Sequence, residues 1–176
     1  KNITKRSDVT FINGFNPSHV GGLIDLTDSI MQAYVINGVD YDLTNILLQA
    51  HIDLKTQKIL LVGHSQGTFY TNTAYNYLVS HGVDKNSISV YNVATPADRV
   101  EGNGGYLTSS TDEVINSIIR NLAAIGSAGK PLPANIDIKI PKNIETDSQE
   151  GHSFNKVYLG LTPDRIIGDI DEKLNS

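Results

Sequence analysis

The chain has 176 residues, of which 39% are hydrophobic and 19% are charged. This composition is typical of a folded protein with one hydrophobic core and excludes a mainly disordered chain. Its 14 Lys and Arg against 19 Asp and Glu give a net charge of -5, with no basic cluster longer than Lys5-Arg6, so no nucleic-acid partner is expected. The longest clean apolar run, Ile59 to Val62, is far below the ~18 residues of a membrane-spanning helix, and the lack of cysteine excludes disulfides, thiolate metal sites and a cysteine nucleophile.

The start of the chain bears on its compartment. It begins at Lys1 and contains one methionine, Met31, so we expect that an N-terminal segment has been removed. This fits an exported protein, periplasmic, envelope-bound or secreted, and equally a shortened chain. The absence of cysteine does not decide between these, because many exported proteins also lack it.

Strand and helix patterns alternate along the chain, without an internal repeat or a Pro/Gly/Ser-rich linker. The predicted elements, in chain order, are a strand at 9–12, a helix at 28–36, a short strand at 39–41, a helix at 44–54, a strand at 58–62, a helix at 68–79, strands at 88–94 and 106–109, a helix at 111–125, a strand at 136–140, and helices at 154–159 and 163–174. This alternation predicts one α/β domain over residues 1–176, with a mostly parallel sheet covered by helices on both faces.

Residues that favour helix ends indicate where three of the predicted helices begin or end. Ser110 and Glu113 have the spacing of a capping box at the start of the helix at 111–125. Thr162 is the expected N-cap of the last helix, with Pro163 in its first turn. His81 ends the helix at 68–79 and is expected to cap its C-terminus.

The segment Gly63-His64-Ser65-Gln66-Gly67 matches the pattern G-x-S-x-G between a buried strand and a helix. The pattern alone arises by chance in roughly one such chain in ten, so its position at a strand-to-helix junction carries the weight. A serine on such a strained turn needs a glycine on either side, so that strand and helix can approach without Cβ clashes. The alternative is an ordinary glycine-rich turn or a phosphate loop, but a Walker lysine is missing and the glycine spacing does not fit a dinucleotide site. The motif therefore predicts that Ser65 is a nucleophile.

A serine nucleophile needs a base. The chain has five histidines, at positions 19, 51, 64, 81 and 152. In folds built around this turn the chain order is serine, acid, histidine, which removes the first two. His64 neighbours the serine and is expected to point away from it, and His81 lies roughly 18 Å along the following helix. His152, in the polar loop 147–153, remains as the predicted base.

The acid must lie between Ser65 and His152. The choices are Asp98, Asp112 and Asp147, with Asp84 and Asp137 less well placed. Asp112 follows the strand at 106–109, and residues past the carboxyl ends of parallel strands point into the ligand-binding crevice. The alternative is that Asp112, in the first turn of a helix, only interacts favourably with the helix dipole, and one residue can fill this structural role and the catalytic role together. Asp98 is next to Arg99, a local ion-pair partner, and Asp147 can only be a loop neighbour of the histidine, so Asp112 is the predicted acid.

An acyl-transfer site also needs donors for the tetrahedral oxyanion. Two backbone N–H groups are predicted to supply them, Gln66 directly after the nucleophile and Phe15 after the turn Asn13-Gly14. The alternative for Asn13-Gly14 is a simple turn.

These residues resemble the α/β-hydrolase superfamily, and more narrowly bacterial lipase-like or esterase-like proteins with a Gly-His-Ser-Gln-Gly elbow. The resemblance extends from Val9 to about Leu161 and is carried by the segments 10–15, 59–67, 108–115 and 151–153, with 93–98 similar to a turn that shapes the site. It implies a reduced α/β-hydrolase fold of cutinase size, or a fragment of a larger one.

The predicted activity is hydrolysis of a carboxylic ester, a small molecule or a lipid, through an acyl-enzyme on Ser65. Asn, Tyr and aliphatic residues outnumber charged ones, which favours a neutral acyl group. An acyltransferase with the same residues and a non-catalytic binding protein on the same fold are the alternatives. No metal or other cofactor is expected, because Asp53 near His51 is the one carboxylate at ligand spacing from His19, His51 or His81.

Overall fold

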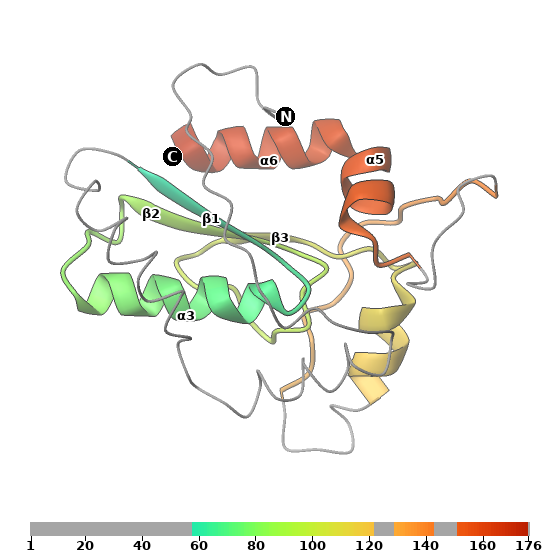
Figure 1. The fold of residues 1–176 in the computed structure, drawn as a ribbon, viewed down its shortest axis with the longest axis horizontal. Helices are drawn as coiled ribbons and strands as arrows, with labels where there is room; N and C mark the ends of the chain where they lie inside the picture. Colours follow the sequence, from blue (N-terminus) through green and yellow to red (C-terminus); the bar gives the residue numbers. More distant parts are fainter. Residues whose placement is uncertain (1–57, 122–128, 143–150, 176) are drawn as a thin grey trace.

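A computed structural model describes residues 58–121, 129–142 and 151–175. Within these ranges three strands, β1 (Ile59–His64), β2 (Ile88–Val93) and β3 (Gly105–Leu107), form a parallel sheet in the order β1-β2-β3 (Figure 1). The register pairs His64 with Val93, and Val93 with Leu107. All three strands therefore end at one edge of the sheet. The elements predicted at 9–12, 28–36, 39–41 and 44–54 lie outside the described residues.

Helices cover both faces of this sheet. Successive strand residues point to opposite faces, and β2 shows where each face leads. The Asn92 Oδ1 accepts a hydrogen bond from Thr71 Oγ1 of α3 (Gly67–Ser80) at 2.7 Å. The neighbouring Tyr91 hydroxyl donates to Asp169 Oδ2 of α6 (Pro163–Asn175) at 2.7 Å. The α3 and α6 helices thus pack on opposite faces, as Figure 1 shows, and the described part is an α/β arrangement around a parallel sheet.

Apolar side chains form one core on each face. The smaller core, under α3, contains Ala74, Leu78 and Ile88. The larger one joins the sheet to α6 and to two π-helical segments, η1 (Val114–Ile119) and η2 (Phe154–Tyr158). Its fully or nearly fully buried members are Tyr91, Val93, Ala94, Leu107, Val114, Ile115, Ile119, Ile138, Val157, Tyr158, Ile166 and Ile170. The site described below adjoins this larger core, because Ile115 of η1 and Tyr158 of η2 belong to the core and also hydrogen-bond to Asp112 of the site.

Most predicted elements within the described ranges are confirmed. The strands at 58–62, 88–94 and 106–109 correspond to β1, β2 and β3, and the helices at 68–79 and 163–174 correspond to α3 and α6. The helix predicted at 154–159 begins as η2 and continues as α5 (Leu159–Leu161). Of the helix predicted at 111–125, the described part is η1 and its flanking residues. No helix in the described ranges is both long and apolar enough to cross a membrane.

The strand predicted at 136–140 is wrong. This segment makes one isolated bridge, between Ile136 and Ser109. Side chains take hydrogen bonds that a ladder would use: Thr108 N–H donates to Asn135 Oδ1 at 2.9 Å, and Ile138 N–H donates to Ser109 Oγ at 3.1 Å. The alternating apolar pattern therefore reflects burial of one side of an irregular segment.

The predicted capping box is also wrong. Ser110 Oγ donates to Asp137 Oδ1, and Glu113 Oε2 accepts from Ser117 Oγ, one turn further along. The side chain that accepts at the start of this helix is Asp112, whose Oδ1 takes the Ile115 N–H at 3.1 Å. An ionised carboxylate at a helix N-terminus is favoured by the helix dipole and takes over the capping role.

Candidate active site

The turn between β1 and α3 holds Ser65 in a strained backbone conformation. Its φ is 55°, in the left-handed region that costs a non-glycine residue roughly 1–3 kcal/mol. The turn is held on both sides: Ser65 N–H donates to Val93 O at 3.0 Å, and the Thr68 N–H and Oγ1 donate to Ser65 O at 3.0 and 2.8 Å. The serine is therefore fixed just past the carboxyl edge of the sheet, at the N-terminus of α3.

The two glycines of the motif differ in what they contribute. A Cβ on Gly63 would come within 2.8 Å of Gly67 O and 2.9 Å of Thr68 Cα, both backbone atoms. A Cβ on Gly67 would meet no atom of the described residues within 4 Å. The expectation that both glycines allow the close approach is thus correct for Gly63 and wrong for Gly67.

This difference gives a matched prediction. Gly63→Ala should lower the midpoint of thermal unfolding, because the backbone of the turn must move to admit the new methyl group. Gly67→Ala should leave the midpoint unchanged or raise it, because alanine is favoured over glycine in a helix by roughly 0.5–1 kcal/mol. Circular dichroism melts of the two variants measure this. A larger loss in Gly67→Ala than in Gly63→Ala would contradict the interpretation of the turn.

His152 reaches the serine from a distant part of the chain. Its Nε2 lies 2.8 Å from Ser65 Oγ, and its side chain is almost fully buried. The preceding Gly151 has a φ of +85°, and a Cβ there would collide with the carbonyl oxygen of Thr111. Gly151 therefore lets the chain pass close to the residue before Asp112 and turn the imidazole toward the serine.

Asp112 completes this set of contacts. It is fully buried just beyond β3, and its Oδ2 and Oδ1 lie 2.9 and 3.1 Å from His152 Nδ1. An ionised carboxylate only accepts hydrogen bonds, so Nδ1 carries the proton and Nε2 is the acceptor that faces the serine hydroxyl. The serine, histidine and aspartate singled out in the sequence are thus joined by a continuous path of hydrogen bonds.

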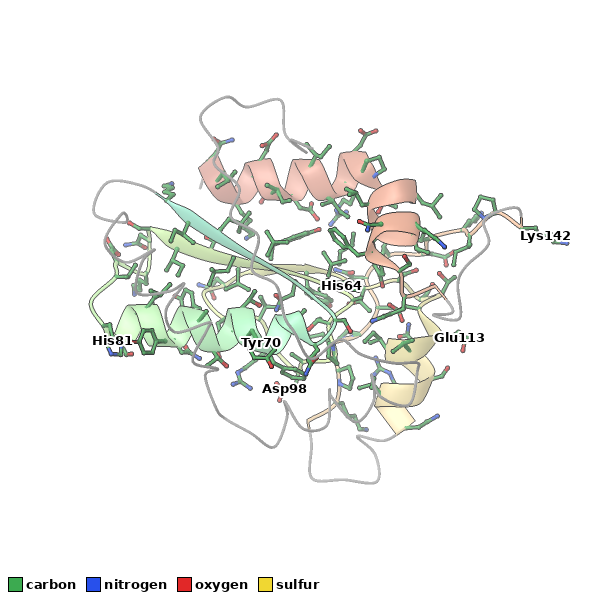
Figure 2. The ribbon with its side chains drawn as sticks, viewed as in Figure 1. His64, Tyr70, His81, Asp98, Glu113 and Lys142 are labelled. Carbon is green, nitrogen blue, oxygen red and sulfur yellow. The ribbon has the colours of Figure 1, made fainter. Side chains whose placement is uncertain are left out.

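The other two histidines within the described ranges make different contacts. His64 contacts the backbone of His152: its Nε2 is 3.0 Å from His152 O, and the two rings are 5.0 Å apart. His81 is at the opposite end of α3 from His64 (Figure 2). It is the C-cap residue, with Nδ1 2.8 Å from Tyr77 O, so its predicted capping role is confirmed.

The remaining acids have partners of their own. Asp98 pairs with Arg99 at 3.1 Å on the surface, as expected (Figure 2). Asp137 accepts from Ser110 Oγ, and Asp84 Oδ1 accepts from Asn86 N–H. Asp147, His19, His51 and Phe15 lie outside the described residues, whereas Gln66, the other predicted oxyanion donor, is the N-cap residue of α3.

Two contributors to the site were missed in the sequence. Tyr158 donates from its hydroxyl to Asp112 Oδ2 at 2.7 Å, and nothing in its sequence context predicts that contact. Gly151 belongs to the segment 151–153 singled out in the sequence, but its backbone role was not predicted, although a glycine directly before a candidate functional residue suggests a special backbone conformation. Across the part of the chain that the structure describes, no three His, Cys, Asp or Glu side chains gather as metal ligands would.

The arrangement can move a proton. The Ser65 hydroxyl faces an imidazole nitrogen whose ring is oriented by a buried carboxylate, which is what nucleophilic attack by a serine needs. Comparisons with models of known protein families, with curated proteins and with solved structures found no match. Function is therefore inferred from the chemistry and geometry of these residues.

Proposed function

We propose that this protein is a serine hydrolase that cleaves a carboxylic ester through an acyl-enzyme on Ser65. The observation that carries the proposal is the unbroken path from Ser65 Oγ through the His152 imidazole to the Asp112 carboxylate, with distances of 2.8 and 2.9 Å. Its place supports the same reading, since the serine follows β1 and the aspartate follows β3 at one edge of a parallel sheet. This order fits a reduced α/β-hydrolase fold over residues 1–176.

In the proposed reaction, Ser65 Oγ attacks the ester carbonyl carbon while its proton passes to His152 Nε2. Asp112 stabilises the imidazolium that forms. The oxyanion is met by the backbone N–H of Gln66 and, as the resemblance implies, that of Phe15. The intermediate collapses to the acyl-enzyme, and the imidazolium gives its proton to the departing alcohol. Water, activated by the same imidazole, then releases the acid and restores Ser65.

The substrate proposed is an uncharged acyl ester, a small molecule or a lipid, and the reaction as written requires no cofactor. Nucleic acid is not proposed as a partner, given the net charge of -5. A competing alcohol in the assay separates hydrolysis from transfer, because an acyltransferase would form the new ester in preference to the acid.

Labelling with a fluorophosphonate tests the proposal directly, because such reagents phosphonylate a serine activated by a neighbouring imidazole. We expect a single modified peptide that contains Ser65, together with hydrolysis of p-nitrophenyl butyrate by the unlabelled protein. Heat-unfolded protein and the His152→Ala variant serve as controls and should not be labelled. Failure to label, or modification of another serine, would overturn the assignment.

The proposed mechanism predicts that activity falls as the medium is made more acidic. A protonated imidazole has no lone pair with which to accept the serine proton. The profile of kcat/KM between about pH 5 and about pH 8 measures this. His81→Ala is the control and should keep the parent profile, since His81 is exposed at the far end of α3. A flat profile together with an active His152→Ala variant would point to a different base.

A further inference from the structure

Tyr158 lies beside Asp112 without touching the serine. It is fully buried in η2, and its hydroxyl makes two hydrogen bonds. It donates to Asp112 Oδ2 at 2.7 Å and accepts from Ser109 N–H at 3.0 Å. A phenol has one proton to donate, and the backbone N–H occupies its acceptor side, so the proton is directed at the carboxylate.

The tyrosine can keep this role because it stays protonated. Burial, and next to it the charge of Asp112, raise the pKa of the Tyr158 phenol far above its ordinary value. The hydroxyl therefore stays protonated, and remains a hydrogen-bond donor, at the neutral pH of an ester assay.

Each oxygen of the carboxylate has its own donor besides the histidine. The Ile115 N–H at the start of η1 holds Asp112 Oδ1 at 3.1 Å, and Tyr158 holds Oδ2. Rotation of the carboxylate about its Cβ–Cγ bond would break both bonds. The plane in which it faces His152 Nδ1 is therefore fixed from two directions.

The same short segment carries both the histidine and the tyrosine. Ser153 is the N-cap of η2, where its Oγ accepts the Lys156 N–H at 3.3 Å, and its carbonyl accepts the Tyr158 N–H at 3.2 Å. His64 packs against this segment, with its ring 5.4 Å from that of Phe154. His152 directly precedes the N-cap of η2 and Tyr158 is the last residue of η2, so one short, hydrogen-bonded segment places both side chains beside Asp112.

We propose that Tyr158 is a positioning residue. Its hydroxyl holds the Asp112 carboxylate where that group accepts the hydrogen bond from His152 Nδ1, and the same hydroxyl partly neutralises the negative charge of the carboxylate. The inference rests on the proposed function of Ser65, His152 and Asp112, and names a fourth side chain on which their chemistry depends.

Tyr158→Phe tests this, because phenylalanine keeps the ring and removes the hydroxyl. We expect kcat for p-nitrophenyl butyrate to fall about 10- to 100-fold, as when the partner that orients a ligating or catalytic group is lost, with KM unchanged. The acid limb of the pH profile should move to higher pH, because a carboxylate without this donor stabilises the imidazolium more strongly.

Tyr91→Phe is a matched control. Tyr91 is also buried in the larger core, and its hydroxyl also donates to a carboxylate at 2.7 Å, that of Asp169 in α6. Loss of that bond should lower the unfolding midpoint about as much as Tyr158→Phe does, with kcat and the acid limb unchanged.

A second replacement tests the same proposal if the Tyr158→Phe variant does not fold. Substitution of 3-fluorotyrosine at position 158 keeps the shape of the residue and makes the phenol a stronger donor. The acid limb should then move to lower pH, opposite in sign to the phenylalanine variant.

In an Asp112→Asn background, Tyr158→Phe should have little further effect on kcat, because both changes act on one contact.

The outcomes separate the two proposals. An active parent in which neither replacement moves kcat or the acid limb beyond the Tyr91→Phe control would overturn the role of Tyr158 alone. A parent that neither hydrolyses the ester nor reacts with fluorophosphonate would overturn the proposed function, and the role of Tyr158 with it.

Discussion

Replacement of Ser65 by alanine is expected to lower kcat for ester hydrolysis on the order of 10⁶-fold, the usual loss when a serine nucleophile is removed. The acyl-enzyme cannot form without Oγ, and His152 is left with no hydroxyl to deprotonate. The fold should persist, because the hydrogen bonds that hold the turn involve the backbone of Ser65 and the side chain of Thr68. Hydrolysis of p-nitrophenyl butyrate and a thermal melt measure the two effects.

Ser80→Ala is the control for this variant. Ser80 lies at the other end of α3, exposed, with its Oγ donating to Tyr77 O. Its replacement should change neither turnover nor fluorophosphonate labelling. Undiminished turnover in Ser65→Ala, or labelling of that variant at another serine, would contradict the mechanism.

Asp112→Asn should be impaired by roughly 10⁴-fold, severely but less than loss of the serine. An amide can present an N–H to His152 Nδ1, which favours the imidazole form whose proton faces the serine. An amide nitrogen toward Tyr158 would also oppose the phenol proton, which now points at Asp112 Oδ2. Steady-state kinetics at a pH above the acid limb, where the imidazole is neutral, isolate this effect.

Asp98→Asn is the matched control among the acids. Asp98 is paired with Arg99 on the surface, with the two side chains 41% and 64% exposed, and exposed pairs contribute only about 0 to 1 kcal/mol. Its turnover should stay within a few-fold of the parent. If Asp98→Asn fell by orders of magnitude and Asp112→Asn did not, the acid would belong to the turn after β2.

Local structure around the serine could be read from the sequence because its causes are local. A buried strand, a glycine-flanked serine and a helical pattern follow one another between Ile59 and Ser80, and the structure places β1, the turn and α3 there. Chain order and the elimination of other histidines and acids singled out Ser65, Asp112 and His152, which the structure brings within hydrogen-bonding distance. These three residues could be grouped from the sequence, although they are far apart in it, because few side chains have both the chemistry and the position along the chain that a nucleophile, an acid or a base requires.

Tertiary structure decided what depends on contacts between distant segments. The apolar alternation at 136–140 looks like a strand, but Asn135 and the Ser109 side chain take up its pairing. The sequence pattern does not distinguish the two glycines of the motif. Only the packing of the strand against the helix shows that a side chain would clash at Gly63 and not at Gly67.

The same holds for Tyr158, one of 8 tyrosines in the chain. Its hydroxyl meets Asp112 and Ser109 only because the fold brings η2 to the residues that follow β3, across more than 40 positions of sequence. The sequence by itself determined the local turn and the kinds of side chain available for the chemistry, since backbone propensity and residue type act over a few positions. The folded chain decided which groups orient them, because hydrogen bonds and steric exclusion depend on distances in space.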